Sequence, residues 1–150
     1  MGAASRLDDQ RRYEQEHEQL ATRMALTGGG AMLALAGSAM PWTHGLEHNT
    51  EGRLAGDGRY TALLAIALLF CAAWYYRRPQ RVSARAGAAV AVALLALAIV
   101  FWNNVSDDVD SANHDAGLFA TATVAPGIWV LLIGAILATI GAIWTLRVDR

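Results

Sequence analysis

The 150-residue chain has no lysine, a single cysteine and only three prolines. With one cysteine, Cys71, it cannot form an intramolecular disulfide, and it has no metal site of the CxxC kind. Its formal net charge is only −1, so there is no overall charge excess to attract nucleic acid or another anionic partner. These absences point away from disulfide-rich domains, zinc ribbons and nucleic-acid-binding proteins.

Charge is also absent from four long apolar segments, and this absence decides the fold class. Segments 24–42, 60–76, 86–102 and 126–146 contain no Asp, Glu, Lys, Arg or His. A helix crosses the bilayer core, which is about 30 Å thick, with about 20 apolar residues. Helices that lie on a membrane surface would instead show polar residues at every third or fourth position. We therefore expect an all-α membrane protein built as a four-helix transmembrane bundle.

The parts outside these spans divide the chain further. We expect residues 1–23 to form a cytoplasmic tail, residues 24–147 the four-span domain, and residues 148–150 a short cytoplasmic end. The tail should be helical, because Ser5 and Asp8 have the spacing of a capping box and neither glycine nor proline follows before the first span.

Two longer connections, 41–59 and 103–125, should build a small cap on the outer side of the membrane. Gly45, Gly52 and the Gly-Asp-Gly at 56–58 are typical of turns, which makes a short hairpin plausible in the first connection. Segment 118–124 in the second has the composition of a short β-strand.

The distribution of arginine predicts the orientation. Cytoplasmic links of membrane proteins carry an excess of basic residues. Ten arginines lie on one side of the four spans: Arg6, Arg11, Arg12, Arg23, Arg77, Arg78, Arg81, Arg85, Arg147 and Arg150. The opposite side carries two arginines and seven acids: Arg53, Arg59, Glu47, Glu51, Asp57, Asp107, Asp108, Asp110 and Asp115. We expect a multi-pass protein of the cell membrane with both termini in the cytoplasm.

Aromatic residues favour the same alternation. Tryptophan and tyrosine prefer the membrane–water interface, where one end of the ring system stays wet. The outer ends of the spans carry Trp42, Tyr60, Trp102 and Trp129, and the inner ends carry Trp74, Tyr75, Tyr76 and Trp144.

Small residues recur along the first and fourth spans. In lipid, helices associate through close van der Waals contact, which small side chains permit. The predicted helix-packing residues are Gly30, Ala34, Ser38, Gly127, Gly134 and Gly141. Because the period is seven residues, we expect a left-handed seam. Two interpretations stay open: the stripes pack inside the bundle, or one of them faces outward and binds another membrane protein.

The outer connections contain the only candidates for chemistry. Residues 44–48 read His-Gly-Leu-Glu-His, the pattern of the inverted zinc proteases, but a short link leaves no room for a substrate cleft. Simple zinc or copper binding is a separate hypothesis, since His44, His48 and His114 all lie on the outer side and imidazole is an ordinary ligand of both metals. The alternative is a solvated polar loop surface.

Three short motifs carry a family resemblance: Pro41-Trp42 after the first span, Gly56-Asp57-Gly58 before the second, and Pro126-Gly127-Ile128-Trp129 opening the fourth. On these motifs the chain resembles a group of small, largely uncharacterised four-span membrane proteins of actinobacteria and related prokaryotes, over roughly residues 24–147. The layout is also loosely claudin-like, although claudins carry two cysteines in the first outer link and this chain has none there. The resemblance implies no catalytic residues.

The sequence thus favours a protein that is not an enzyme. The spans lack the ionisable groups that transport pathways normally need, and the links lack a credible catalytic set. The expected function is an interaction, scaffold or accessory subunit of the cell envelope, with the lipid bilayer and either further copies of itself or another membrane protein as partners. The alternatives are a homo-oligomeric channel or small-molecule transporter, and an extracytoplasmic metal-binding membrane protein.

Overall fold

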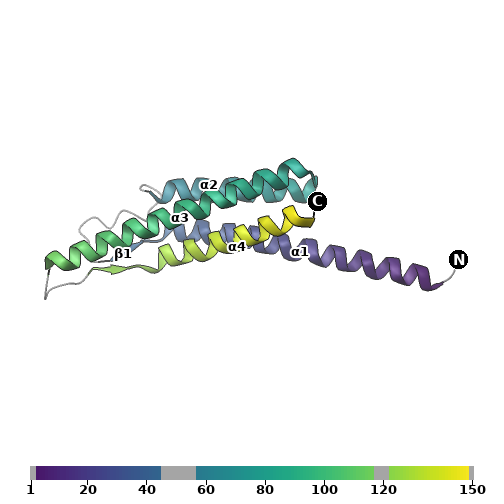
Figure 1. Cartoon of the computed structure of the whole chain (residues 1–150), viewed down its shortest axis with the longest axis horizontal. Coiled ribbons are helices and arrows are strands. Elements are labelled where there is room, and N and C mark those ends of the chain that lie inside the picture. The colour runs from purple at the N-terminus through teal and green to yellow at the C-terminus, as the bar shows by residue number, and fades with distance from the viewer. Residues whose placement is uncertain (1–2, 45–56, 117–121, 149–150) are drawn as a thin grey trace.

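The computed structural model describes residues 3–44, 57–116 and 122–148. Four helices account for most of them: α1 (Ala3–Ala39), α2 (Gly58–Arg77), α3 (Arg81–Ala116) and α4 (Pro126–Val148). Two short strands, β1 (Thr43–His44) and β2 (Thr123–Val124), complete the described elements. The helices form an elongated all-α bundle, and its long axis is horizontal in Figure 1.

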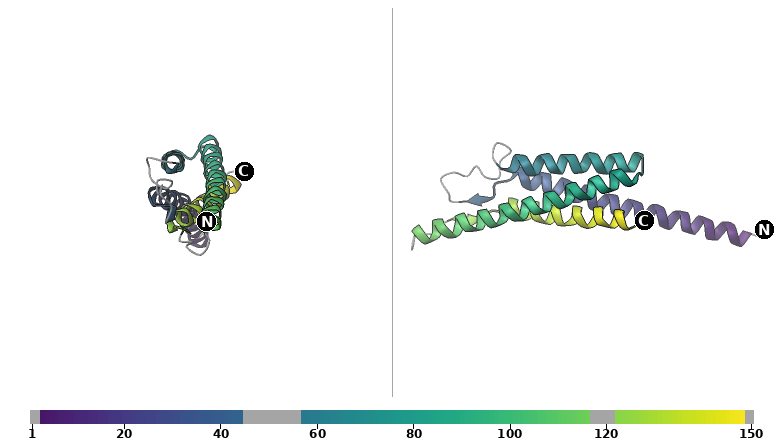
Figure 2. Two further views of the ribbon diagram at one scale, coloured as in Figure 1. Left: turned by 90° about the vertical axis from the view of Figure 1, so that its left-hand side faces the viewer. Right: turned by 45° about the horizontal axis from the view of Figure 1, so that its top comes forward.

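The helices form a ring in chain order. Contacts join α1 to α2, α2 to α3 and α3 to α4, and the most extensive interface, between α1 and α4, closes the ring. Figure 2 shows the same bundle from its end and after a turn about its long axis. The core is built mostly of small side chains, with leucine or isoleucine at intervals: Ala31, Ala34, Ala65, Leu68, Ala91, Leu94, Ala98, Ile128, Leu131, Ala135 and Ala138. Small core residues let the helix backbones approach closely.

Three of the four helices, α2, α3 and α4, are long and apolar enough to cross a membrane. A multi-pass membrane protein fits these helices. Their outward surface suits contact with lipid, since Leu63, Ile66, Phe70, Ile133 and Ile140 are all exposed. Four such spans were predicted, and α1 is not among the three. Gly28–Gly30 and the polar residues at either end of its apolar segment lower its mean hydropathy.

Two helices are longer than the spans predicted for them. The predicted tail is helical and continuous with the first apolar segment, so α1 has 37 residues. α3 has 36 residues and continues 14 residues past Trp102, where we had expected the outer connection to begin. No glycine or proline interrupts residues 103–116, and Val105 and Val109, one helical turn apart, are both buried. The change from apolar to polar sequence therefore does not end the helix.

One helix projects beyond each end of the bundle. In Figure 1 the C-terminal end of α4 and the α2–α3 connection lie at one end of the bundle, and α1 projects beyond that end. α3 projects beyond the opposite end. We call these projecting parts the α1 arm (residues 3–22) and the α3 arm (residues 103–116). α4 begins at Pro126, as its fixed φ and missing N–H favour for a first turn.

Candidate functional site

The α1–α4 interface is a seam of direct backbone contact. A Cβ added to Gly30 would lie 2.7 Å from the carbonyl oxygen of Gly134 and would collide with the backbone nitrogen of Ala138. A Cβ on Gly134 would in turn lie 2.6 Å from the carbonyl oxygen of Gly30. Real Cβ atoms essentially never approach so closely, so neither position has room for a side chain.

The seam keeps one register over its whole length. Gly141 lies against Thr27 near one end, Gly37 against Leu131, and Gly127 against Pro41 near the other end. The steps along α1 alternate between three and four residues, which is the spacing of a left-handed antiparallel seam. Five of the six predicted packing residues are in contact across this seam, namely Gly30, Ala34, Gly127, Gly134 and Gly141.

The sixth predicted packing residue, Ser38, connects a different pair of helices. Its buried hydroxyl lies 2.7 Å from the Thr61 hydroxyl of α2 and also donates to the Ala34 carbonyl, at 2.8 Å. A second hydroxyl joins α4 to α3, because Thr139 Oγ1 lies 3.2 Å from the Ala91 carbonyl oxygen. Each hydroxyl has a partner, so the bundle interior holds these polar groups without an unsatisfied donor.

At the end of the bundle from which the α3 arm projects, the two long connections meet. β1 and β2 pair antiparallel, with Thr43 opposite Val124 and His44 opposite Thr123. The backbone nitrogen of Ala125 also donates to the Trp42 carbonyl, at 2.7 Å. The sheet therefore joins the end of α1 to the start of α4. We had expected a hairpin within the first connection; its residues 45–56 lie outside the described part of the chain.

Asn113 fixes the second connection to the α3 arm. Its amide nitrogen donates to the Ala122 carbonyl at 2.9 Å, and its amide oxygen accepts from the Ala122 backbone nitrogen at 3.1 Å. One side chain thus mimics a strand neighbour just before β2. Sequence reasoning had missed this role, since an asparagine in a polar stretch reads as a solvated residue.

The predicted metal ligands are not assembled in the described residues. His44 is exposed on β1 and His114 is exposed near the end of α3, while His48 lies outside the described residues. Within residues 3–44, 57–116 and 122–148, no group of three or more His, Cys, Asp or Glu side chains could hold a metal ion. The His-Gly-Leu-Glu-His motif likewise falls mostly in undescribed residues.

Trp42 closes the core at the end of the bundle where β1 and β2 pair. Its side chain is 1% exposed, and its indole nitrogen donates to the Gly37 carbonyl at 3.0 Å, near the end of α1. Its ring lies 5.3 Å from that of Phe101 on α3. Above these rings is a cavity of about 190 Å³, also lined by Asp57, Asn104, Val105 and Asp108. The sequence had placed Trp42 only as an interfacial residue.

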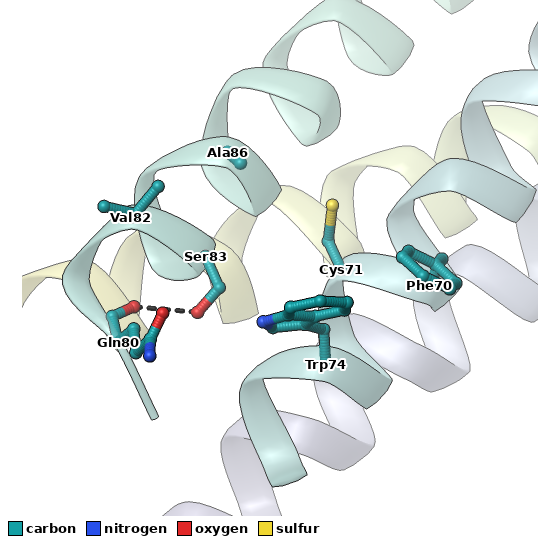
Figure 3. Close-up of a pocket in the computed structure, with 7 residues that line it drawn as sticks. All are labelled: Phe70, Cys71, Trp74, Gln80, Val82, Ser83 and Ala86. Atoms are coloured by element: carbon teal, nitrogen blue, oxygen red, sulfur yellow. Dashed lines mark hydrogen bonds between the residues drawn. The ribbon is translucent and has the colours of Figure 1, made fainter. Parts of the chain in front are cut away.

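A second hollow lies between α2 and α3 next to the connection that joins them, and has a volume of about 270 Å³ (Figure 3). Phe70, Cys71 and Trp74 of α2 form one wall, and Val82, Ser83 and Ala86 of α3 form the other. The Ser83 hydroxyl donates to the Gln80 carbonyl at 2.8 Å, as the dashed line in Figure 3 marks. The hollow is mostly apolar, and its polar groups are the half-buried Cys71 thiol, the Ser83 hydroxyl and Gln80.

The end of the seam next to the α1 arm, which we call the inner end for the orientation proposed below, carries a buried cation that the sequence did not single out. Arg23 is 5% exposed, and its guanidinium lies over the Trp144 ring, 5.5 Å from the ring centroid. One of its terminal nitrogens donates to the side-chain oxygen of Gln19 at 2.9 Å. Arg23 comes directly before an apolar segment, so sequence reasoning counted it only among the cytoplasmic charges.

Comparison with known proteins finds no match to this chain among family models, curated proteins or solved structures.

Proposed function

We propose that the chain is a four-span integral membrane protein of the cell envelope that acts without catalysis, as an interaction, scaffold or accessory subunit. The observation that carries this proposal is that two of the four bundle helices, α1 and α3, continue without a break into projecting arms, one at each end of the bundle (Figure 1). A continuous helix holds its arm at a defined angle to the membrane, which suits a protein that presents surfaces to partners.

The register of the seam supports a membrane crossing by α1. The segment from Thr27 of α1 to Pro41, just after the helix, lies against α4 from Gly141 to Gly127. α4 is long and apolar enough to span a membrane. Since the two segments lie side by side, the apolar part of α1 occupies the same depth as α4. Gly30 and Gly37 lower the hydropathy of α1, yet both face α4 instead of lipid.

The orientation rests on the positions of the arginines. The inner end, which includes the α2–α3 connection and the end of α4, carries the exposed Arg77, Arg78, Arg81 and Arg147. The α3 arm at the other end carries the exposed Asp107, Asp108, Asp110 and Asp115. Basic residues favour the cytoplasmic side, so the α1 arm and both termini are placed in the cytoplasm.

Cysteine labelling tests this topology. In a Cys71→Ala background, Ser111→Cys on the α3 arm should react with an impermeant thiol reagent in intact cells, whereas Glu18→Cys and Gln80→Cys should react only after the cells are opened. Reaction of Glu18→Cys in intact cells would mean that α1 does not cross. The reverse labelling pattern at Ser111 and Gln80 would mean that the protein has the opposite orientation in the membrane.

The interior supports an interaction role over a pore within one chain. Alanine, leucine and isoleucine fill most of the core. At the inner end of the core, a cavity bounded by all four helices has a volume of only about 20 Å³; its lining includes Thr27, Cys71, Ser83 and Ala142. A channel would therefore need several copies. The claudin-like layout remains part of the proposal, since two outer connections join in a small sheet here.

A charge reversal on the α3 arm tests the function. Protein purified from its native membrane in mild detergent should carry a foreign partner in fixed stoichiometry, measured by mass determination. Asp107→Arg combined with Asp110→Arg should remove that partner. Arg59→Glu, a charge reversal at an exposed residue of α2 on the same side, should keep it. A closed ring of identical chains with no partner would favour the channel instead.

A further inference from the structure

Arg23, at the inner end of the α1–α4 seam, has no counter-charge among the side chains that the structure describes. Arg23 is almost completely buried, and its Nε has no hydrogen-bond partner in the part of the chain that the structure describes. Its one side-chain hydrogen-bond partner there, Gln19, is neutral. Buried charges are normally paired, because removing them from water is costly. The stacking on Trp144 offsets part of this cost but supplies no counter-charge.

Trp144 also forms part of a hollow on α4. The hollow has a volume of about 390 Å³ and is lined by Ile140, Ile143, Trp144 and Arg147. The two isoleucines are exposed, and Arg147 lies in the last turn of the helix. The hollow is therefore apolar toward the middle of the bundle and ends in an exposed guanidinium. This polarity matches an amphiphile with an apolar chain and an anionic head.

We propose that this end of the seam binds an anionic phospholipid from the inner leaflet. An acyl chain lies along Ile140 and Ile143, and the phosphate accepts hydrogen bonds from Arg147, whose planar fork suits phosphate oxygens. Arg23, held over Trp144, adds a second positive charge beside the headgroup. The lipid then supplies the counter-charge that Arg23 lacks. This inference rests on the proposed membrane crossing of α1 and α4.

Charge distinguishes an anionic lipid from a zwitterionic one. Arg23 and Arg147 both favour a head with net negative charge, and the described lining of the hollow includes no carboxylate to receive a choline group. An arginine near an anionic lipid surface changes the affinity by about fivefold. The two arginines together therefore predict a preference of at least about tenfold for phosphatidylglycerol over phosphatidylcholine.

Native mass spectrometry of the full chain in mild detergent tests the site, with dioleoyl phosphatidylglycerol and dioleoyl phosphatidylcholine as probes. Arg147→Gln and Arg23→Gln should each lower the affinity for phosphatidylglycerol about fivefold and leave phosphatidylcholine binding unchanged. Arg85→Gln is the matched control, because Arg85 is an exposed arginine near the inner end of α3. Arg147 is itself exposed, so its variant stays informative even if Arg23→Gln unfolds.

Three results would overturn the proposal. Equal binding of both lipids by the wild type would show that the site has no preference for an anionic head. An equal loss of phosphatidylglycerol affinity in Arg85→Gln and Arg147→Gln would mean that general surface charge, and not this site, attracts the lipid. Displacement of phosphatidylglycerol by millimolar inorganic phosphate would indicate a free-anion site. Any of these results leaves the labelling pattern and the partner experiment untouched, so a failure here is separate from a failure of the proposed function.

Discussion

Replacing Gly134 by leucine should lower the free energy of unfolding by about 3 kcal/mol or more, at the upper end of what overpacking costs. The reason is the contact across the seam, where a Cβ on Gly134 would collide with the backbone of Ala34 and lie 2.6 Å from the Gly30 carbonyl oxygen. A flexible side chain could move aside, but helix backbone cannot. The two helices would have to separate along much of their interface.

Gly29→Leu is the matched control for this substitution. Gly29 lies in the same apolar part of α1, next to Gly30, and a Cβ there would meet nothing within 4 Å. Because leucine favours a helix over glycine by almost 1 kcal/mol, the control should be neutral or slightly stabilising. Denaturant unfolding in detergent, followed by circular dichroism, measures both variants. Equal stability of the two proteins would contradict the seam.

Removal of the Trp42 side chain should destabilise the bundle by about 3–5 kcal/mol, the usual range for a buried tryptophan replaced by alanine. Trp42 is 1% exposed, packs against Phe101 and satisfies the Gly37 carbonyl near the end of α1. Trp42→Ala would leave a cavity where β1 begins, so the pairing of β1 with β2 should weaken as well.

The comparison for Trp42→Ala is Trp74→Ala, at a tryptophan that is 49% exposed on α2. Its loss removes contact with lipid or detergent and a ring contact with Phe70, so a loss of only about 1 kcal/mol is expected. Thermal unfolding in detergent, with amide exchange of Thr43 and Val124 as a local readout, separates the two sites. A larger loss of stability in Trp74→Ala than in Trp42→Ala would show that Trp42 is not a core residue.

Several features could be predicted because they depend on local sequence. The starts of α2 and α4 follow from the Gly-Asp-Gly and from Pro126, and the helical tail follows from the absence of breakers in residues 3–23. The continuation of α3 past Trp102 could have been found in the same way, since residues 103–116 lack glycine and proline and carry Val105 and Val109 one turn apart. The polarity of that segment predicted the end of the helix. A change to polar residues marks where the apolar span ends, but a helix can continue beyond it.

The candidate sites were less accessible to sequence reasoning. The seven-residue stripes identified the packing residues of α1 and α4 but left open whether they pack inside the bundle or against another protein. The pairing of β1 with β2 joins two-residue strands about 80 residues apart. A short strand was predicted in segment 118–124, which includes β2, but its pairing with Thr43–His44 depends on how the helix ends are arranged, which no local pattern shows. Arg23 looked like its neighbouring tail charges, because nothing local reveals that Trp144 will cover it.

By itself, then, the sequence predicted four helices with long apolar segments, the starts of α2 and α4 and the positions of the small residues; three of the helices, α2, α3 and α4, are long and apolar enough to cross a membrane. These properties depend on hydropathy and on helix-breaking residues, which act within a few turns. The tertiary structure alone decided that α1 and α4 share a glycine seam, that Ser38 pairs with Thr61, and that the outer connections meet in a sheet. Those outcomes depend on which helix faces are adjacent, and adjacency is settled only when all four helices pack together.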